Sequence, residues 1–299
     1  MLSSTRASAT EALAPRAAAG FLAHSLWALR RMPAAWIGGA IVLALLIVAL
    51  FGSALVLFDP LRIVPVNKLL APSPAHPFGT DDLGRDLLSR VVAGARISLL
   101  VGVLVLAIAM TVGVGLGLIA GHWGGWTDEV IMRTTDVFLS FPRLVLAVAI
   151  AATLGPGLYN AMVAVALSWW PWYTRLVRGQ ILSLREQEFI LAVVSLGAAR
   201  GRILLRHLLP NVATVVVIQA SIDFGYAILT TAGLSFIGLG AAPPTPEWGS
   251  MIAQARSYMI DAWWYPTFPG LAIFVAVLGF NLLGDAIRDA FDPRLRSTR

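Results

Sequence analysis

REQEFILAVVSLGAARGRILLRHLLPN, residues 185–211, is a charged, helix-compatible segment that lies between two strongly apolar runs. Arginines crowd its second half, and Pro210 is expected to end it where the next apolar run begins. Gly197 divides the segment, because a glycine inside a helical pattern weakens propagation and permits a turn. We therefore expect two short amphipathic helices joined at Gly197, held at a membrane surface and built to dock into another protein. A basic loop that rests on anionic lipid is the alternative.

The composition indicates an integral membrane protein. Of 299 residues, 58% are hydrophobic and only 13% are charged, with a mean hydropathy of +0.79. Soluble domains carry about a quarter charged residues. The net charge is +6, and in a membrane protein such basicity reflects cytoplasmic loops rather than nucleic-acid binding.

Several kinds of chemistry are excluded by residue types that the chain lacks. There are no cysteines, which excludes disulfides, thiolate metal sites and cysteine nucleophiles. The four histidines are far apart and form no short metal-ligand spacing. Lys68 is the single lysine, and no glycine-rich loop precedes it, so ATP cannot bind through a Walker phosphate loop. We expect no catalytic residue, no metal site and no bound cofactor in this chain.

Six apolar runs predict an all-α fold with six transmembrane helices. These runs cover residues 34–58, 97–120, 137–154, 159–173, 212–234 and 268–283. A cleaved signal peptide is the competing interpretation of the first run, which is too long for one and starts too far into the chain. Small residues in the second run let helices approach closely in lipid. They include Gly102, Gly113, Gly115 and Gly117.

Six spans place both termini on one side of the membrane. Sixteen of the 22 arginines and lysines fall on that side, so the positive-inside rule puts the termini and the 185–211 segment in the cytoplasm. Arg143 is expected near the inner end of the third span, where its long side chain can reach the surface. The expected organisation is a tail (1–33), the first span (34–58), an external loop (59–96), a core of five spans (97–284) and a second tail (285–299).

GTDDLGRD, residues 79–86, resembles a metal or phosphate site, but its spacing fits no calcium loop. We expect Thr80 or Asp81 to cap a short interfacial helix over 83–96, with acidic residues near its positive end. The external-face candidates are Thr80, Asp81, Asp82, Arg85 and Asp86.

A polar stripe is predicted inside the fifth span. Gln219, Asp223, Tyr226 and Thr230 follow i, i+4, i+7, i+11 spacing and share one helix face. An intramembrane carboxylate is costly and normally faces a bundle interior or a wet cavity. The stripe therefore either lines a translocation pathway, with Asp223 meeting a cationic group such as a peptide ammonium, or contacts a neighbouring helix or subunit.

Trp169, Trp170 and Trp172 lie near the expected cytoplasmic end of the fourth span. Interfacial anchoring is the default role for such rings, and a cation cage is the alternative. Pro171 is expected to kink that helix.

The 185–211 segment resembles the cytoplasmic "EAA" loop of ABC-importer permeases. Its pattern is Glu-Ala-Ala, three residues, Gly, and then a Leu-Pro farther on, and Ala192, Gly197, Leu209 and Pro210 match it. Leu191 stands where the family usually has Glu, and Val193 where it has Ala.

Three further stretches resemble the second permease subunit of dipeptide and oligopeptide importers, and glutathione and nickel permeases share them. They are HPFGTDDLGRDLLSRVVAGARISL (76–99), SFIGLGAAPPTPEWG (235–249) and FPGLAIFVAVLGFNLLGDAIRDAFDPR (268–294).

This resemblance implies a type I ABC-importer permease fold in a bacterial plasma membrane. It implies that the chain works with a homologous permease, an external substrate-binding protein, and two cytoplasmic ATPase subunits that bind ATP and Mg²⁺. The EAA loop would be the coupling helix seated in a groove of the ATPase. The coupling residues would be Ala192, Gly197, Ala198, Arg200, Arg202, Ile203, Arg206, Leu209 and Pro210.

The function that the resemblance implies is ATP-driven import of peptides or similar small solutes. Nickel or glutathione uptake is the alternative within the family. An ion-coupled secondary transporter with Asp223 as its ion site is the alternative from another class, although the sequence has no convincing internal repeat.

Overall fold

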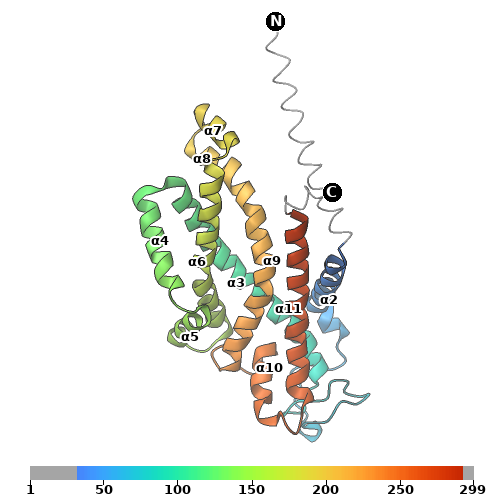
Figure 1. The fold of residues 1–299 in the computed structure, drawn as a ribbon. Coiled ribbons are helices and arrows are strands. Elements are labelled where there is room, and N and C mark those ends of the chain that lie inside the picture. The colour runs from blue at the N-terminus through green and yellow to red at the C-terminus, as the bar shows by residue number, and fades with distance from the viewer. Residues whose placement is uncertain (1–31, 292–299) are drawn as a thin grey trace.

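The computed structural model describes residues 32–291, and its secondary structure there is helical apart from one isolated bridge between Thr80 and Asp86. Figure 1 shows long helices side by side, with short helices at both ends of the bundle. The α-helices are α2 (Pro33–Leu55), α3 (Leu87–Trp123), α4 (Gly125–Leu139), α5 (Arg143–Leu154), α6 (Leu158–Arg185), α7 (Glu188–Ser195), α8 (Arg200–Ile203), α9 (Leu209–Phe236), α10 (Trp248–Ala255) and α11 (Trp264–Phe291). Short 3₁₀ turns cover Pro65–Asn67 and Arg256–Tyr258, and a π-helical turn covers Leu204–Leu208.

The packing of α3 against α6 is built on glycines. A Cβ atom added at Gly113 would lie 2.6 Å from the carbonyl oxygen of Trp170, and one at Gly117 would lie 2.7 Å from that of Thr174. Neither position can hold even alanine without movement of a backbone, so the two helices are closer than larger residues permit. The predicted role of small residues in the second span is thus confirmed at both positions. It does not apply to Gly115, where an added Cβ would meet no atom within 4 Å.

Helix α9 packs against α3 and α11. A Cβ at Gly102 of α3 would lie 2.8 Å from the ring of Phe224 in α9. That ring stacks on Phe280 of α11, with centroids 4.0 Å apart. Helix α2 lies against α11, where a Cβ at Gly38 would lie 2.6 Å from the backbone nitrogen of Leu283. Close contacts at small residues therefore recur across the bundle.

Within residues 32–291, four helices are long and apolar enough to cross a membrane, or five spans result if one bent pair counts as a span. The qualifying helices are α2, α3, the continuous α8–α9 segment and α11, with α4 and α5 as a fifth if that bent pair is one span. The expected third span is wrong as a single helix, because α4 and α5 meet at an angle of 91°. Pro142 stands at the break, and a proline disfavours helical geometry in the residue before it. Helix α6 does not qualify, although its 28 residues extend about 42 Å.

Several expected boundaries are corrected. No separate interfacial helix covers 83–96, because α3 begins at Leu87 and runs unbroken through the expected boundary at residue 97. Pro210 does not end a segment, because it stands in the first turn of α9, where a proline is tolerated. Helix α11 continues to Phe291, past the expected tail boundary at 285. The rest of the two expected tails, residues 1–31 and 292–299, lies outside the described residues.

The tryptophan prediction is also wrong for two of its three residues. Trp169 and Trp170 are only 4% and 7% exposed, and they lie inside the bundle rather than at a lipid surface. Helix α6 continues to Arg185, so these rings are near its middle and not at its end. Pro171 is inside the same helix and is buried.

We predict that Gly117→Ala destabilises the folded chain and Gly115→Ala does not. The new methyl group at 117 overlaps α6, and overpacking costs about 1–3 kcal/mol. At 115 the methyl group meets open space, and alanine is the better helix former. Thermal unfolding of the detergent-solubilised importer checks this. Equal melting temperatures for the two variants would contradict the glycine contact.

Candidate functional site

A two-helix hairpin projects from one end of the bundle, formed by α7, Gly197 and α8 (Figure 1). Gly197 has φ +74°, a left-handed conformation that favours glycine. Its N–H donates to the Val194 carbonyl (2.9 Å), and the Ala198 N–H donates to the Val193 carbonyl (3.3 Å). These two hydrogen bonds form a Schellman motif, which closes α7 and turns the chain into α8. The expected division of the segment at Gly197 is confirmed.

The hairpin exposes an apolar surface that the sequence prediction did not single out. Phe189, Leu191, Val194 and Leu196 are between 44% and 86% exposed. A run of apolar residues at helical spacing within an otherwise charged segment was the available signal. Exposed apolar surface beside charges is typical of protein docking sites.

The predicted coupling residues divide into three groups by exposure. Ile203 is 6% exposed and packs into the core of its own chain, so its side chain does not contribute to the exposed surface of the hairpin. Ala198 and Leu209 are half-buried. The exposed members are Ala192, Gly197, Arg200, Arg202, Arg206 and Pro210.

A polar cluster occupies the middle of the bundle. The Tyr173 hydroxyl of α6 donates to Asp223 Oδ2 (2.8 Å), and Gln219 Nε2 donates to Asp223 Oδ1 (3.1 Å). Asp223 is 6% exposed, while Tyr226 on the same stripe is 50% exposed. The half-buried Thr230 donates its hydroxyl to the Tyr226 carbonyl (2.7 Å). Both oxygens of the carboxylate are thus engaged within the chain.

Three arginines lie between α6 and the bent α4–α5 pair. Arg178 of α6 forms a bidentate pair with Asp128 of α4, with both N···O distances 2.6 Å. One turn earlier on α6, Arg175 pairs with Asp136 of α4 at 2.5 Å. Arg143, the first residue of α5, places its guanidinium 4.7 Å from the ring centre of Trp172. Arg143 therefore lies beside the middle of α6, and its expected position near the inner membrane surface stays a prediction.

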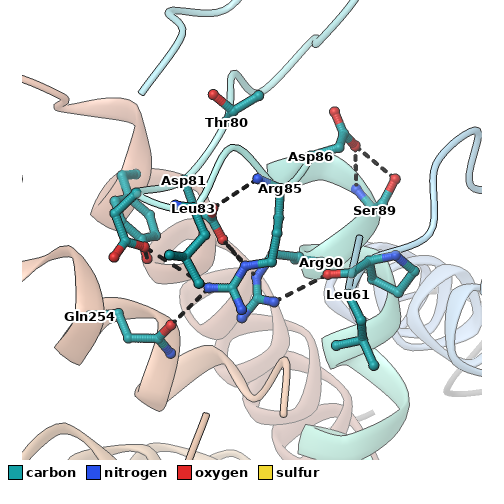
Figure 2. Close-up of polar contacts among 12 residues, drawn as sticks. Leu61, Thr80, Asp81, Leu83, Arg85, Asp86, Ser89, Arg90 and Gln254 are labelled. Carbon is teal, nitrogen blue, oxygen red and sulfur yellow. Dashed lines mark hydrogen bonds and ion pairs between the residues drawn. The ribbon is translucent and has the colours of Figure 1, made fainter. Parts of the chain in front are cut away.

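At the opposite end of the bundle, the Asp81 carboxylate balances the positive charges of two buried arginines (Figure 2). Its Oδ2 lies 2.5 Å from Arg85 Nε and 3.4 Å from Arg90 Nε, and all three side chains are at most 2% exposed. Arg85 also donates to Gln254 of α10 (3.1 Å), and Arg90 donates to the Pro60 carbonyl (3.2 Å). The Asp81 carboxylate therefore links Arg85 of the 59–96 loop to Arg90 in the first turn of α3.

Asp86, rather than Thr80 or Asp81, is the helix cap. Its Oδ2 accepts from the Ser89 N–H (2.8 Å) at the first turn of α3, which corrects the expected cap. Its other oxygen lies 2.8 Å from His76 Nδ1. The Thr80 carbonyl accepts from Trp264 Nε1 (3.2 Å), and Asp82 accepts from the Tyr265 hydroxyl (2.8 Å). The five external candidates therefore belong to one network, and they attach the loop to α3 and α11.

Glu247 begins α10 near this network. Its carboxylate accepts from the N–H groups of Gly249 (2.9 Å) and Ser250 (2.8 Å). Burial raises the pKa of Glu247 above its usual range, and these two hydrogen bonds oppose the rise. Among the described residues 32–291, no three histidine or carboxylate side chains converge as metal ligands.

We predict that Asp81→Asn strongly destabilises the chain, because it leaves Arg85 and Arg90 buried without a full counter-charge. Removing one partner of a buried ion pair costs about 3–5 kcal/mol. Asp82→Asn is the matched control, since Asp82 is 26% exposed and lies 4.0 Å from Arg85. Unfolding midpoints of the importer should fall far more for Asp81→Asn. Similar midpoints would argue against the shared carboxylate.

Comparison with known proteins agrees with this geometry. Residues 113–297 match the family described as "Binding-protein-dependent transport system inner membrane component". The chain is 45% identical to the dipeptide transport system permease protein DppC of Alkalihalophilus pseudofirmus, over 90% of this chain and 88% of that protein. It is 46% identical to the probable D,D-dipeptide transport system permease protein DdpC of Escherichia coli, over 91% of each chain. It is 45% identical to the glutathione transport system permease protein GsiD of Pectobacterium atrosepticum, over 87% of this chain and 86% of that one.

A solved structure supports the same fold. A chain of the MetNI methionine ABC transporter in an inward-facing conformation superposes with a TM-score of 0.54 at 20% identity, covering 67% of this chain and 95% of that one. The expected type I ABC-importer permease fold is confirmed, as is the resemblance to peptide-importer permeases. Because its fold is helical and these matches extend over most of its length, the chain belongs to the family of inner-membrane components of binding-protein-dependent transport systems.

Proposed function

We propose that this chain is one of two permease subunits of an ABC importer that carries di- or oligopeptides into the cytoplasm. The observation that carries the proposal is its identity of 45–46% to the dipeptide-type permeases along almost the full length of both chains. Glutathione, itself a peptide, is the alternative substrate that the relatives name.

The proposed topology has six membrane crossings with both termini in the cytoplasm. The bent α4–α5 pair would be one crossing, and α6 would be the sixth. In support, α2 begins and α11 ends towards the end of the bundle that carries the α7–α8 hairpin (Figure 1). The arginines of that hairpin would then lie on the cytoplasmic side, in agreement with the positive-inside rule.

The hairpin is the proposed contact with the ATPase subunits. Leu196 and Val194 offer apolar anchors, and exposed arginines beside them can pair with carboxylates on the rim of a partner groove. ATP and Mg²⁺ would bind to those partner subunits. The hairpin lies between α6 and α9 in the chain, so its movement would pass to those two helices. From them it would pass to the homologous permease that faces this chain.

The polar stripe of α9 is proposed to lie along the pathway. Asp223 accepts hydrogen bonds from Tyr173 and Gln219, so its first role is to hold α6 and α9 in register. A direct contact with a substrate ammonium group is the second possible role, and it requires one of these hydrogen bonds to open.

We predict that Gly197→Val uncouples transport, because valine is strained in the left-handed conformation that closes α7. That strain is about 1–2 kcal/mol. Gly201→Val adds the same side chain to the same hairpin, in open space and without positive φ, and should retain most activity. Peptide-stimulated ATP hydrolysis and uptake by the reconstituted importer provide the measurement. Normal coupling in Gly197→Val would rule out the hairpin as the coupling element.

We predict that Asp223→Asn lowers uptake by a similar factor for peptides with free and with acetylated amino termini. The reason is that the change weakens the contact between α6 and α9 rather than a contact with the substrate. Uptake rates of the two peptide forms in the complete importer check this. A loss confined to the free-amine peptide would instead assign Asp223 to the substrate ammonium.

A further inference from the structure

Arg143 is a charged side chain at mid-depth in the bundle. Its guanidinium stacks on Trp172, the fifteenth of the 28 residues of α6. The neighbouring Tyr173 contacts Asp223, the fifteenth of the 28 residues of α9. Two long helices thus meet at their midpoints beside Arg143. If these helices cross the membrane, the guanidinium is near the centre of the bilayer.

The surroundings of Arg143 leave its charge free for an incoming group. In the described part of the chain, no carboxylate lies within 4 Å of it, whereas Arg175 and Arg178 on the adjacent face of α6 each hold an aspartate of α4. The buried Asp223 is within electrostatic range of Arg143, but its two oxygens accept from Tyr173 and Gln219. Arg143 itself is exposed on the surface of this chain.

Lipid cannot be what covers this side chain. A charge at the centre of a bilayer is costly, and such residues face a bundle interior or a water-filled cavity. The bend between α4 and α5 places Arg143 at its corner, and stacking on Trp172 fixes one face of the guanidinium by a cation–π contact. The N–H groups of a guanidinium lie in its own plane, and a planar carboxylate can accept hydrogen bonds from two of them.

We propose that Arg143 is a specificity-determining residue that binds the carboxylate of the substrate as it passes. The inference rests on the proposed function, since dipeptides and glutathione all carry a free carboxylate. The Trp172 ring positions the guanidinium, and Arg143 supplies the charge. A carboxylate from the facing permease is the other source of the same chemistry, and the experiment below separates the two.

The test compares uptake of trialanine and of trialanine amide by the complete reconstituted importer. Each rate is expressed relative to the wild-type rate for the same peptide, so that selectivity of the external binding protein cancels. We expect Arg143→Gln to lower trialanine uptake at least tenfold and amide uptake less than threefold. Arg143→Lys should recover only part of the trialanine rate, because it restores the charge but not the two parallel hydrogen bonds.

Arg133→Gln is the matched control. It removes a guanidinium from the same bent pair, at an exposed position where Arg133 pairs only with Glu129 of its own helix, and should change neither rate. Equal losses for the two peptides in Arg143→Gln would indicate a partner carboxylate and overturn the proposal, as would no loss for either. If the wild-type importer takes up neither dialanine, trialanine nor glutathione, the proposed peptide function itself fails. An unaltered ratio of rates in Arg143→Gln refutes the role of Arg143 alone.

Discussion

The close approach of α3 and α6 is the constraint on which the other features depend. Gly113 and Gly117 let the backbone of α3 lie directly on that of α6. In lipid, where there is no hydrophobic gain from bringing helices together, such contacts supply the packing energy. The position of α6 then determines where Tyr173 meets α9, where Trp172 meets Arg143, and where the chain leaves the bundle to form the α7–α8 hairpin. One contact between two helices therefore places both the mid-bundle polar cluster and the α7–α8 hairpin.

Charge is balanced differently at three levels of the bundle. At the end opposite the hairpin, the Asp81 carboxylate balances two buried arginines and holds the loop against α3. Between α4 and α6, Asp128 and Asp136 each take one arginine. At mid-depth, the Asp223 carboxylate accepts hydrogen bonds from two neutral side chains. The Arg143 guanidinium there lies over an aromatic ring. The first two arrangements stabilise the structure, and the third leaves the charge of Arg143 exposed on the surface of this chain.

Features set by local backbone geometry could be predicted from the sequence. Gly197 interrupts a helical pattern, and a left-handed glycine at a helix end follows from that. Small residues in an apolar run predicted the close packing at Gly113 and Gly117. The helix cap could not be chosen in the same way, because Asp81 and Asp86 both precede the apolar run. Only the three-dimensional placement of Arg85 and Arg90 assigns Asp81 to ion pairing and leaves Asp86 to cap α3. The bend at Pro142 was signalled by the proline but hidden by apolar residues on both sides, so a single straight span was predicted there.

The central claim is that the hairpin at Gly197 receives force from a separate ATPase subunit. Because the chain has no cysteine, a single Leu196→Cys variant carries one thiol at the hairpin, and Ile260→Cys carries one at an exposed position at the opposite end. Each thiol is labelled with a benzophenone maleimide in the assembled importer. Irradiation should then crosslink position 196, but not position 260, to an ATPase subunit. The yield of that crosslink should change when ATP is added. Absence of that product from an intact, transporting complex would contradict the account.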